Sequence, residues 1–294
     1  MLNDLILRIS DLLAHFFPLE CMEPEFMRRA MLGLLLIAPL AALSGVQVVN
    51  SRMSFFSDAI GQSAFAGVAL GLIFSLPGQS METAVDFSMP ALALVIGLLI
   101  MYLRRGSRLS TDTVIGIIFS AVVAFGLAIV SRNREASRGV NMFLYGDILT
   151  IGDNEIALLA LLLVAFLAFQ FFAWNRMLHI SVNEQIAGVH RIKVAVYQYL
   201  FAALLSLVVI LCVRAVGVLL VTAVLIVPAA TARNFARNSR QLFFLSLFFS
   251  YISCAGGLLI SAQEWAGVPA GAAIVLLACA MFAISFAAAR LIRK

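Results

Sequence analysis

Hydrophobic residues run along this chain in long blocks that are separated by short polar stretches. From residue 30 to the C-terminus these blocks are long enough to cross a hydrocarbon layer of roughly 30 Å as helices. A transmembrane β-barrel would instead show short segments of alternating hydrophobicity. We therefore predict an all-α polytopic membrane protein with eight or nine transmembrane helices. The expected spans are 30–49, 57–76, 89–103, 112–131, 154–174, 194–212, 216–231, 241–262 and 268–289.

The segments that flank and join these blocks are short. In residues 1–25, apolar side chains recur at helical spacing on one face, which predicts an amphipathic segment on the membrane surface. Asp4 and Asp11 interrupt this stretch, which argues against a cleaved signal. No connection is long enough for a folded soluble domain, so we expect residues 26–294 to form a single transmembrane domain.

Composition supports a membrane protein and excludes other classes. The chain is 63% hydrophobic and 12% charged, whereas about 25% of the residues of a soluble domain are charged. The net charge of +5 comes from short basic clusters between apolar blocks, where orientation signals lie, and does not indicate nucleic-acid binding. These clusters favour a cytoplasmic C-terminus and leave the side of the N-terminus open. The four cysteines lack metal-site spacing and are interpreted as packing residues.

The sequence lacks the motifs of an enzyme. It contains no glycine-rich phosphate loop, no HExxH, no GxSxG and no Cys/His cluster. The remaining hypothesis is a transport protein that draws on energy supplied by another chain.

The stretch "SDAIGQSAFAGVALG", residues 57–71, carries the clearest candidate site. Asp58 and Gln62 are four residues apart, so on a helix they share one face about 6 Å apart. A charged side chain costs about 2.5–3.5 kcal/mol at the membrane centre, so such residues usually face a pathway. The alternative is that Asp58 caps the helix at the water interface. Beside them runs a row of small residues that predicts close packing with another helix: Ala59, Ser63, Gly67 and Gly71.

A second candidate lies in "RAVGVLLVTAVLIVPAATARNFARNSR", residues 214–240. Pro228 removes a backbone donor and predicts a bend or a helix–turn–helix. A small-residue and basic stretch follows, which would suit docking of a soluble partner, although an ordinary basic loop is the alternative. The residues concerned are Pro228, Ala229, Ala230, Thr231, Arg233 and Arg237.

These two stretches and three others resemble the corresponding sequences of one family of transport proteins. The other stretches are "YGDILTIG" (145–152), "NEQIAGV" (183–189) and "GVPAGAAIVLLA" (267–278). In order and spacing they are similar to the membrane permeases of bacterial ABC importers for manganese, zinc and iron(II). The likeness begins at about residue 26 and continues through the chain.

The resemblance implies a type II ABC importer permease, related in fold to those for cobalamin and siderophores, in the bacterial inner membrane. It implies three kinds of partner: a second permease copy or paralogue, cytoplasmic ABC ATPases that hydrolyse ATP, and an extracytoplasmic metal-binding lipoprotein. No tightly bound cofactor is expected, and a divalent metal ion would pass transiently between the two permease subunits. Residues 225–240 would form short coupling helices seated in the ATPase.

The chain departs from the family at one candidate ligand. The family typically carries His four residues after the Asp, and this chain has Gln62. A carboxamide oxygen is a harder, weaker ligand than imidazole and suits manganese or magnesium better. An importer of metal chelates such as haem, siderophores or cobalamin is the nearest alternative, and a stand-alone secondary transporter is a more distant one. The metal and the identity of the second subunit stay open.

Overall fold

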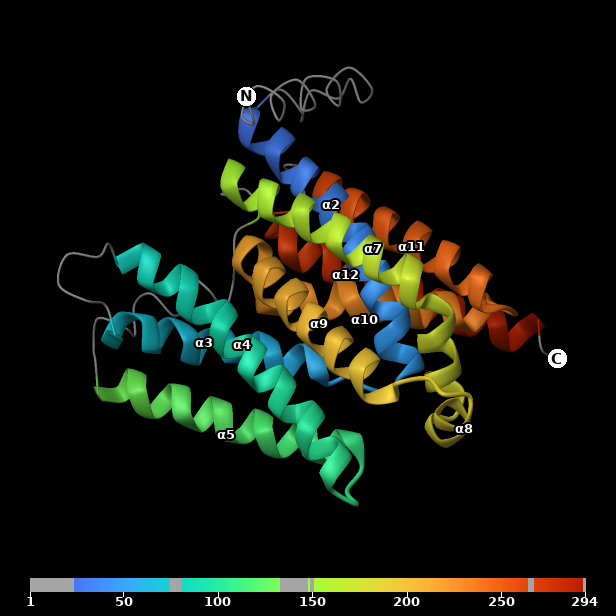
Figure 1. The fold of residues 1–294 in the computed structure, drawn as a ribbon. Helices are drawn as coiled ribbons and strands as arrows, with labels where there is room; N and C mark the ends of the chain where they lie inside the picture. The colour runs from blue at the N-terminus through green and yellow to red at the C-terminus, as the bar shows by residue number, and fades with distance from the viewer. Residues whose placement is uncertain (1–23, 75–80, 133–147, 149–150, 264–266, 293–294) are drawn as a thin grey trace. The chain divides into compact units, whose positions relative to one another are not determined.

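The computed structural model describes residues 24–74, 81–132, 148, 151–263 and 267–292, and every extended element in this part of the chain is a helix (Figure 1). The helices are α2 (Glu25–Asn50), α3 (Phe56–Phe74), α4 (Met81–Gly106), α5 (Thr111–Arg132), α7 (Asp153–Val182), α8 (Glu184–Val189), α9 (Val194–Val216), α10 (Val218–Phe235), α11 (Ser239–Ser261) and α12 (Ala270–Ile292). The amphipathic segment expected at the N-terminus lies almost wholly outside the described residues.

The prediction of an all-α polytopic membrane protein is confirmed. Eight of the described helices are long and apolar enough to cross a membrane. The predicted span 57–76 corresponds to α3, whose 19 residues extend about 28 Å at 1.5 Å per residue. The remaining helix, α8, has only 6 residues and is too short to cross.

Several helices extend beyond their predicted bounds, α4 and α7 by the most. The helix α4 begins at Met81, eight residues before the predicted start, because polar residues near the membrane edge do not stop a helix. The helix α7 continues to Val182, past the last apolar block, and its 30 residues make it about 45 Å long. Of the bend or helix–turn–helix expected at Pro228, the helix–turn–helix is wrong, because α10 continues through the proline as one helix to Phe235.

Proline is tolerated inside membrane helices because neighbouring groups compensate for the lost hydrogen bond. α2 and α4 also contain interior prolines, Pro39 and Pro90. At Pro228 the neighbour is α2: a Cβ added to Gly45 would lie 3.3 Å from the Cβ of Ala229 and overlap the carbonyl of Leu225. The glycine therefore lets α2 support the backbone of α10 beside the proline.

The chain forms two compact units with interleaved segments. Unit 1 comprises 1–46, 146–165 and 215–294, and in it α10, α11 and α12 pack on one another. The first part of α2 belongs to this unit, and the hydroxyl of Ser250 donates to the carbonyl of Ala38 at 3.0 Å. Unit 2 comprises 47–145 and 166–214, and in it α3 packs against both α4 and α5.

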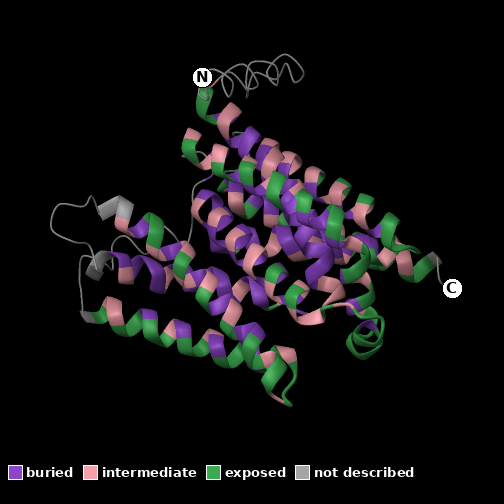
Figure 2. Ribbon diagram, viewed as in Figure 1, coloured by how far each residue is buried: buried purple, intermediate pink, exposed green. Residues whose placement is uncertain are grey.

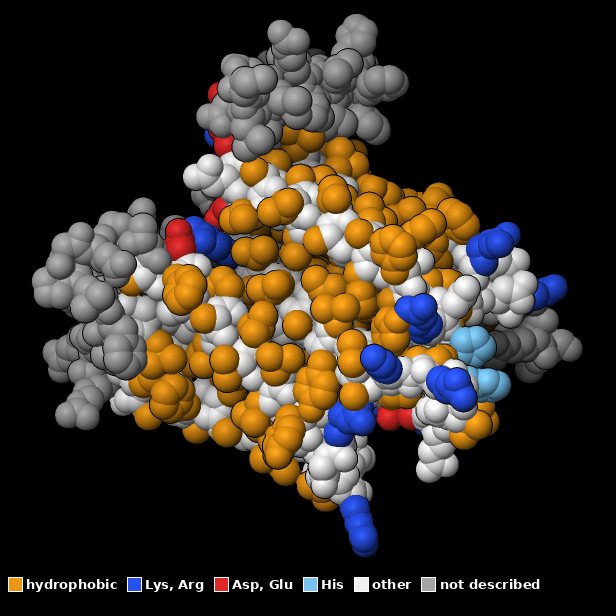
Figure 3. All heavy atoms as spheres, viewed as in Figure 1, with side chains coloured by type: hydrophobic (Ala, Val, Ile, Leu, Met, Phe, Trp, Pro, Cys, Tyr) orange, Lys and Arg blue, Asp and Glu red, His pale blue; other side chains and the backbone are white. Residues whose placement is uncertain are grey.

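Burial within the helices follows the expectation for a lipid-embedded protein. α3 is buried along almost its whole described length, whereas α5 and the middle of α7 expose large apolar side chains such as Phe125 (50%), Leu161 (68%) and Phe172 (76%) (Figure 2). Most of the surface visible in Figure 3 is hydrophobic. Such a surface is compatible with hydrocarbon and would be unfavourable in water.

Candidate functional site

Basic residues identify one end of unit 2 as cytoplasmic. They follow α2, end α4, lie late in α7 and precede α9: Arg52, Arg104, Arg105, Arg108, Arg176, Arg191 and Lys193. Lys and Arg accumulate in cytoplasmic connections of membrane proteins. The described part of the opposite end contains Asp86, which pairs with Arg214 at 2.6 Å. We therefore assign the end that carries Arg104 to the cytoplasm.

Asp58 lies near the start of α3, at the end of this helix that is closer to Arg104. Gly67 is opposite Met89 and Gly71 is opposite Val85, so α3 and α4 run antiparallel. The same register places Asp58 level with Leu98, and six residues of α4 separate that level from Arg104, or about 9 Å. Asp58 therefore lies inward, along the helices, of the arginines at the end of α4.

The sequence left open the alternative that Asp58 caps its helix. The structure shows that Asp58 is not the N-cap of α3. It is the third residue of α3, and the first turn is closed by backbone bonds such as that from the N–H of Ala59 to the carbonyl of Phe55, 3.0 Å. Among the described residues, no group donates a hydrogen bond to its carboxylate or pairs with it. Its half-buried oxygens are thus available to another ligand.

Asp58 and Gln62 lie on the single accessible stripe of α3. Within residues 56–71 only four side chains are partly exposed, namely Asp58, Gln62, Phe65 and Leu70, and all others are buried. The first three are spaced by four and three residues, so they follow one face of the helix. Asp58 and Gln62 therefore lie together on the partly exposed stripe of α3.

The row of small residues lies on a buried face of the same helix. Ala59 and Ser63 are fully buried, and the hydroxyl of Ser63 donates to the carbonyl of Ile60 at 2.6 Å. A Cβ on Gly67 would lie 2.9 Å from the Cα of Met89, and one on Gly71 would lie 2.9 Å from the Cα of Val85. In the structure, α4 lies directly against the two glycines.

The end of α10 and the start of α11 form a second candidate surface, in unit 1. No separate short helix occupies residues 225–240: α10 ends at Phe235 and α11 begins at Ser239. Pro228, Ala229 and Thr231 are buried, so a partner could touch only Ala230, Arg233 and Arg237 among the residues singled out in the sequence. This is a correction to the expected coupling helices.

An open groove of about 490 Å³ lies beside these arginines. The backbone N–H of Arg237 donates to the side chain of Gln241 at 3.1 Å and so fixes the turn between the helices. Sequence reasoning missed the apolar members of the groove, because phenylalanines in "QLFFLSLFF" are as typical of a lipid-facing helix. The lining residues are Phe235, Arg237, Arg240, Gln241, Phe244 and Leu245.

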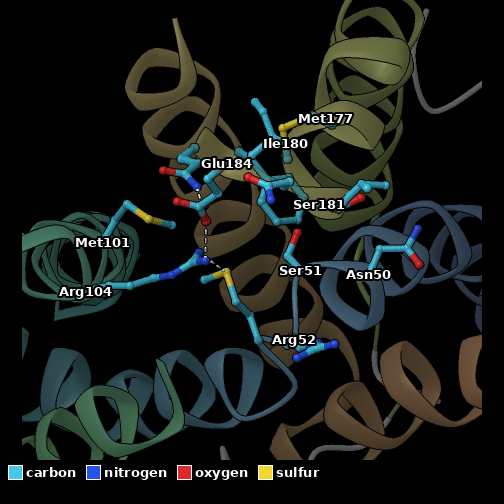
Figure 4. Close-up of a pocket in the computed structure, with 14 residues that line it drawn as sticks. Asn50, Ser51, Arg52, Met101, Arg104, Met177, Ile180, Ser181 and Glu184 are labelled. Atoms are coloured by element: carbon cyan, nitrogen blue, oxygen red, sulfur yellow. Dashed lines mark hydrogen bonds and ion pairs between the residues drawn. The ribbon is translucent and has the colours of Figure 1, made fainter. Parts of the chain in front are cut away.

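A polar network joins three helices at the cytoplasmic end of unit 2. Arg104 pairs with Glu184 at 2.7 Å, and Glu184 also accepts from the side chain of Gln198 at 2.8 Å. Arg105 donates to the same glutamine at 3.3 Å. Figure 4 shows Arg104 and Glu184 at the edge of a cavity of about 250 Å³, with Met101, Met177 and Ile180 on its apolar walls. The sequence drew attention to 183–189 without predicting these contacts.

In the part of the chain that the structure describes, His, Cys, Asp and Glu side chains nowhere gather in groups of three that could hold a metal ion. A cation near Asp58 would then depend on Gln62, backbone carbonyls, water or another subunit for its remaining ligands.

The fold defines a multi-pass membrane transport protein, in which Asp58 and Gln62 are partly exposed on an otherwise buried helix and each unit carries exposed basic side chains. Residues 23–289 match the family described as "ABC 3 transport family", and the chain belongs to this family. It is a permease subunit, a transport component whose ATP hydrolysis resides on a separate subunit, and such systems also include substrate-binding partners.

Individual relatives support the same assignment. The chain is 28% identical over 261 residues to the high-affinity zinc uptake system membrane protein ZnuB of Haemophilus influenzae, covering 89% of this chain and 97% of the relative. It is 30% identical over 268 residues to the manganese import system permease protein ScaB of Streptococcus gordonii, covering 89% and 91%. Both matches extend over most of this chain and most of the relative.

Two solved structures share the fold. PsaBC from Streptococcus pneumoniae in complex with Fab matches with a TM-score of 0.72 and 30% identity, covering 90% of this chain and 92% of that one. An inward-facing metal-chelate type ABC transporter matches with a TM-score of 0.68 at 17% identity, covering 87% and 84%, and shows the fold alone. The predicted relation to this class of permease is thereby confirmed.

Proposed function

We propose that this chain imports a divalent transition metal ion as half of a permease pair, and that Asp58 and Gln62 line the cytoplasmic part of the passage. The relatives are named for zinc and manganese, so these two ions are the first candidates, and iron(II) rests only on the sequence resemblance. The observation that carries the proposal is the position of both polar side chains on the accessible stripe of an otherwise buried membrane helix.

The side chains of Asp58 and Gln62 are better suited to passing a metal ion on than to holding it tightly. One carboxylate and one carboxamide replace only part of a hydration shell, and a weakly held ion can leave again. A second subunit, either a copy or a paralogue, would supply the other wall of the passage. A metal-binding lipoprotein would deliver the ion outside the cell, and a cytoplasmic ABC ATPase would drive the change of access.

Reconstituted vesicles that contain the complete transporter test this function. Uptake of radiolabelled manganese, zinc and iron is measured with ATP supplied to the ATPase and the binding protein supplied on the opposite side. We expect ATP-dependent accumulation of at least one ion. Accumulation of a haem or cobalamin chelate, with none of the free ions transported, would contradict the proposal.

A further inference from the structure

The contact between Arg176 and Tyr197 marks the cytoplasmic edge of the membrane in unit 2. The guanidinium of Arg176 donates to the Tyr197 hydroxyl, and its Cζ lies 5.2 Å from the centre of the tyrosine ring. Arginine and tyrosine are typical of the membrane–water interface. α7 continues for six residues beyond Arg176, or about 9 Å, before α8 begins. The residues between Arg176 and Tyr197 therefore lie on the water side of this membrane edge.

This water-side stretch exposes an apolar face. Val182, the last residue of α7, is 86% exposed, and Ile186 (57%) and Val189 (82%) are three residues apart and so share one side of α8. We call these three residues the α8 face. Ala187, on the opposite side of α8, is buried. Figure 1 shows α8 at the end of α7 that leads into α9.

The polar network holds α8 in a fixed position. Glu184 at its first turn pairs with Arg104 of α4 and accepts from Gln198 of α9. The side chain of Asn183 caps the helix by accepting from the N–H groups of Gln185 and Ile186, at 2.9 and 3.1 Å. A six-residue helix needs such support, because isolated helices of this length are not stable in water.

Positive charge surrounds the α8 face. Arg52 and Arg191 both have positive φ angles, 53° and 59°, at the position after a helix where glycine is usual. Each turn is closed by a backbone bond, from Met53 to Val48 at 3.0 Å and from Ile192 to Ala187 at 3.2 Å. Both arginines are exposed, and no described acidic residue pairs with either. Figure 3 shows basic and histidine side chains gathered in the region where Figure 1 places α8.

We propose that the α8 face is a docking surface for the cytoplasmic ATPase subunit, separate from the groove at residues 235–245. The surface fits a partner with an apolar hollow bordered by acidic side chains. Lipid is disfavoured as the occupant because the face lies beyond Arg176 and Tyr197. This inference rests on the proposed function, since it requires an ATPase partner.

Photo-crosslinking identifies the occupant directly. Benzoylphenylalanine is placed at Ile186 or at Val189, and at Phe172 as a control, in the complete transporter assembled with its co-expressed ATPase subunit. Phe172 is an exposed apolar residue of α7 on the membrane side of Arg176. We expect covalent permease–ATPase products from 186 and 189 and lipid products from 172. Lipid adducts or permease–permease adducts alone at 186 and 189 would overturn the docking surface.

A charge substitution supplies an independent test. Ile186→Asp should lower the amount of ATPase retained on the purified permease about tenfold or more, because a carboxylate would enter an apolar contact between acidic groups. Leu109→Asp is the matched control: Leu109 is an exposed apolar residue, 53% accessible, in the connection between α4 and α5 at the same end. Equal retention by Ile186→Asp and the unmodified permease refutes this inference alone. Failure of the unmodified permease to retain any ATPase refutes the proposed function as well.

Discussion

Gly67 lies directly opposite Met89, and a Cβ added to the glycine would be 2.9 Å from the methionine Cα. The hydroxyl of Ser88 donates to the carbonyl of Gly67 at 2.8 Å and ties the two helices at the same level. At this level, as at Gly71 and Val85, α4 covers the small-residue face of α3. It leaves the polar strip as the accessible side of the helix.

Substitution of Gly67 by alanine should therefore destabilise the protein, although alanine normally favours a helix. Glycine in a helix interior is about 0.5–1 kcal/mol less favourable than alanine, whereas forcing an extra carbon into a packed contact costs about 1–3 kcal/mol. We expect Gly67→Ala to lower the unfolding temperature of the purified protein in detergent.

Gly116→Ala provides the control for this prediction. Gly116 lies inside α5, and a Cβ added there meets nothing within 4 Å. Only the helix propensity then changes, so the unfolding temperature should rise. If both substitutions shifted the unfolding temperature in the same direction, the contact between Gly67 and α4 would not determine the effect on stability.

Asp58→Ala should reduce metal uptake about tenfold or more while the complex still assembles and hydrolyses ATP at its basal rate. The reason is the loss of the only carboxylate on the accessible stripe of α3. Uptake into vesicles is compared with that of Asp112→Ala, which removes an exposed carboxylate from the first turn of α5 at the same end of unit 2. Normal uptake by Asp58→Ala would remove this residue from the passage.

The sequence predicted the helices well because each apolar block is long enough to need a span. All nine expected blocks coincide with helices, and the partly exposed positions 58 and 62 share a face as their spacing required. The apolar pattern could not predict where helices continue into water, so it missed the first turns of α4 and the last turns of α7. It also missed α8, which is too short to show a period.

Contacts between distant residues account for the rest of what was missed. Arg104 and Glu184 are 80 positions apart, and nothing in either local sequence indicates the other. The helix–turn–helix expected as one alternative at Pro228 followed the behaviour of proline in water-soluble helices. Inside this protein, close packing of α2 at Gly45 accompanies a continuous α10. Tertiary packing thus decided both outcomes.

Gln62→His should change which metal is carried most efficiently. The substitution places an imidazole one turn from Asp58, and imidazole binds zinc more strongly than a carboxamide does. We expect the apparent KM for zinc uptake to fall and the maximal rate of zinc uptake to fall as well, since a tighter site releases its ion more slowly. Manganese uptake should change less.

Gln62→Asn is the matched comparison for this substitution, because it keeps the carboxamide and shortens the side chain by one carbon. Uptake of both ions is measured over a range of free metal concentrations. If histidine and asparagine variants both retain the unmodified ratio of zinc to manganese uptake, Gln62 does not contact the ion.

Charge reversal where α10 ends and α11 begins, in unit 1, should weaken attachment of the ATPase. Arg233 and Arg237 are exposed at the end of α10, and Arg237 lines the groove formed with the start of α11. Arg233→Glu combined with Arg237→Glu would place two carboxylates where a partner meets guanidinium groups, and losing such contacts at an interface costs about 2–5 kcal/mol. Co-purification of the ATPase and metal-stimulated ATP hydrolysis should both fall.

Arg290→Glu, at an exposed position near the end of α12, keeps the two arginines and should behave like the unmodified permease. Undiminished co-purification of the double variant would exclude this groove as the docking site, whatever the α8 face contributes.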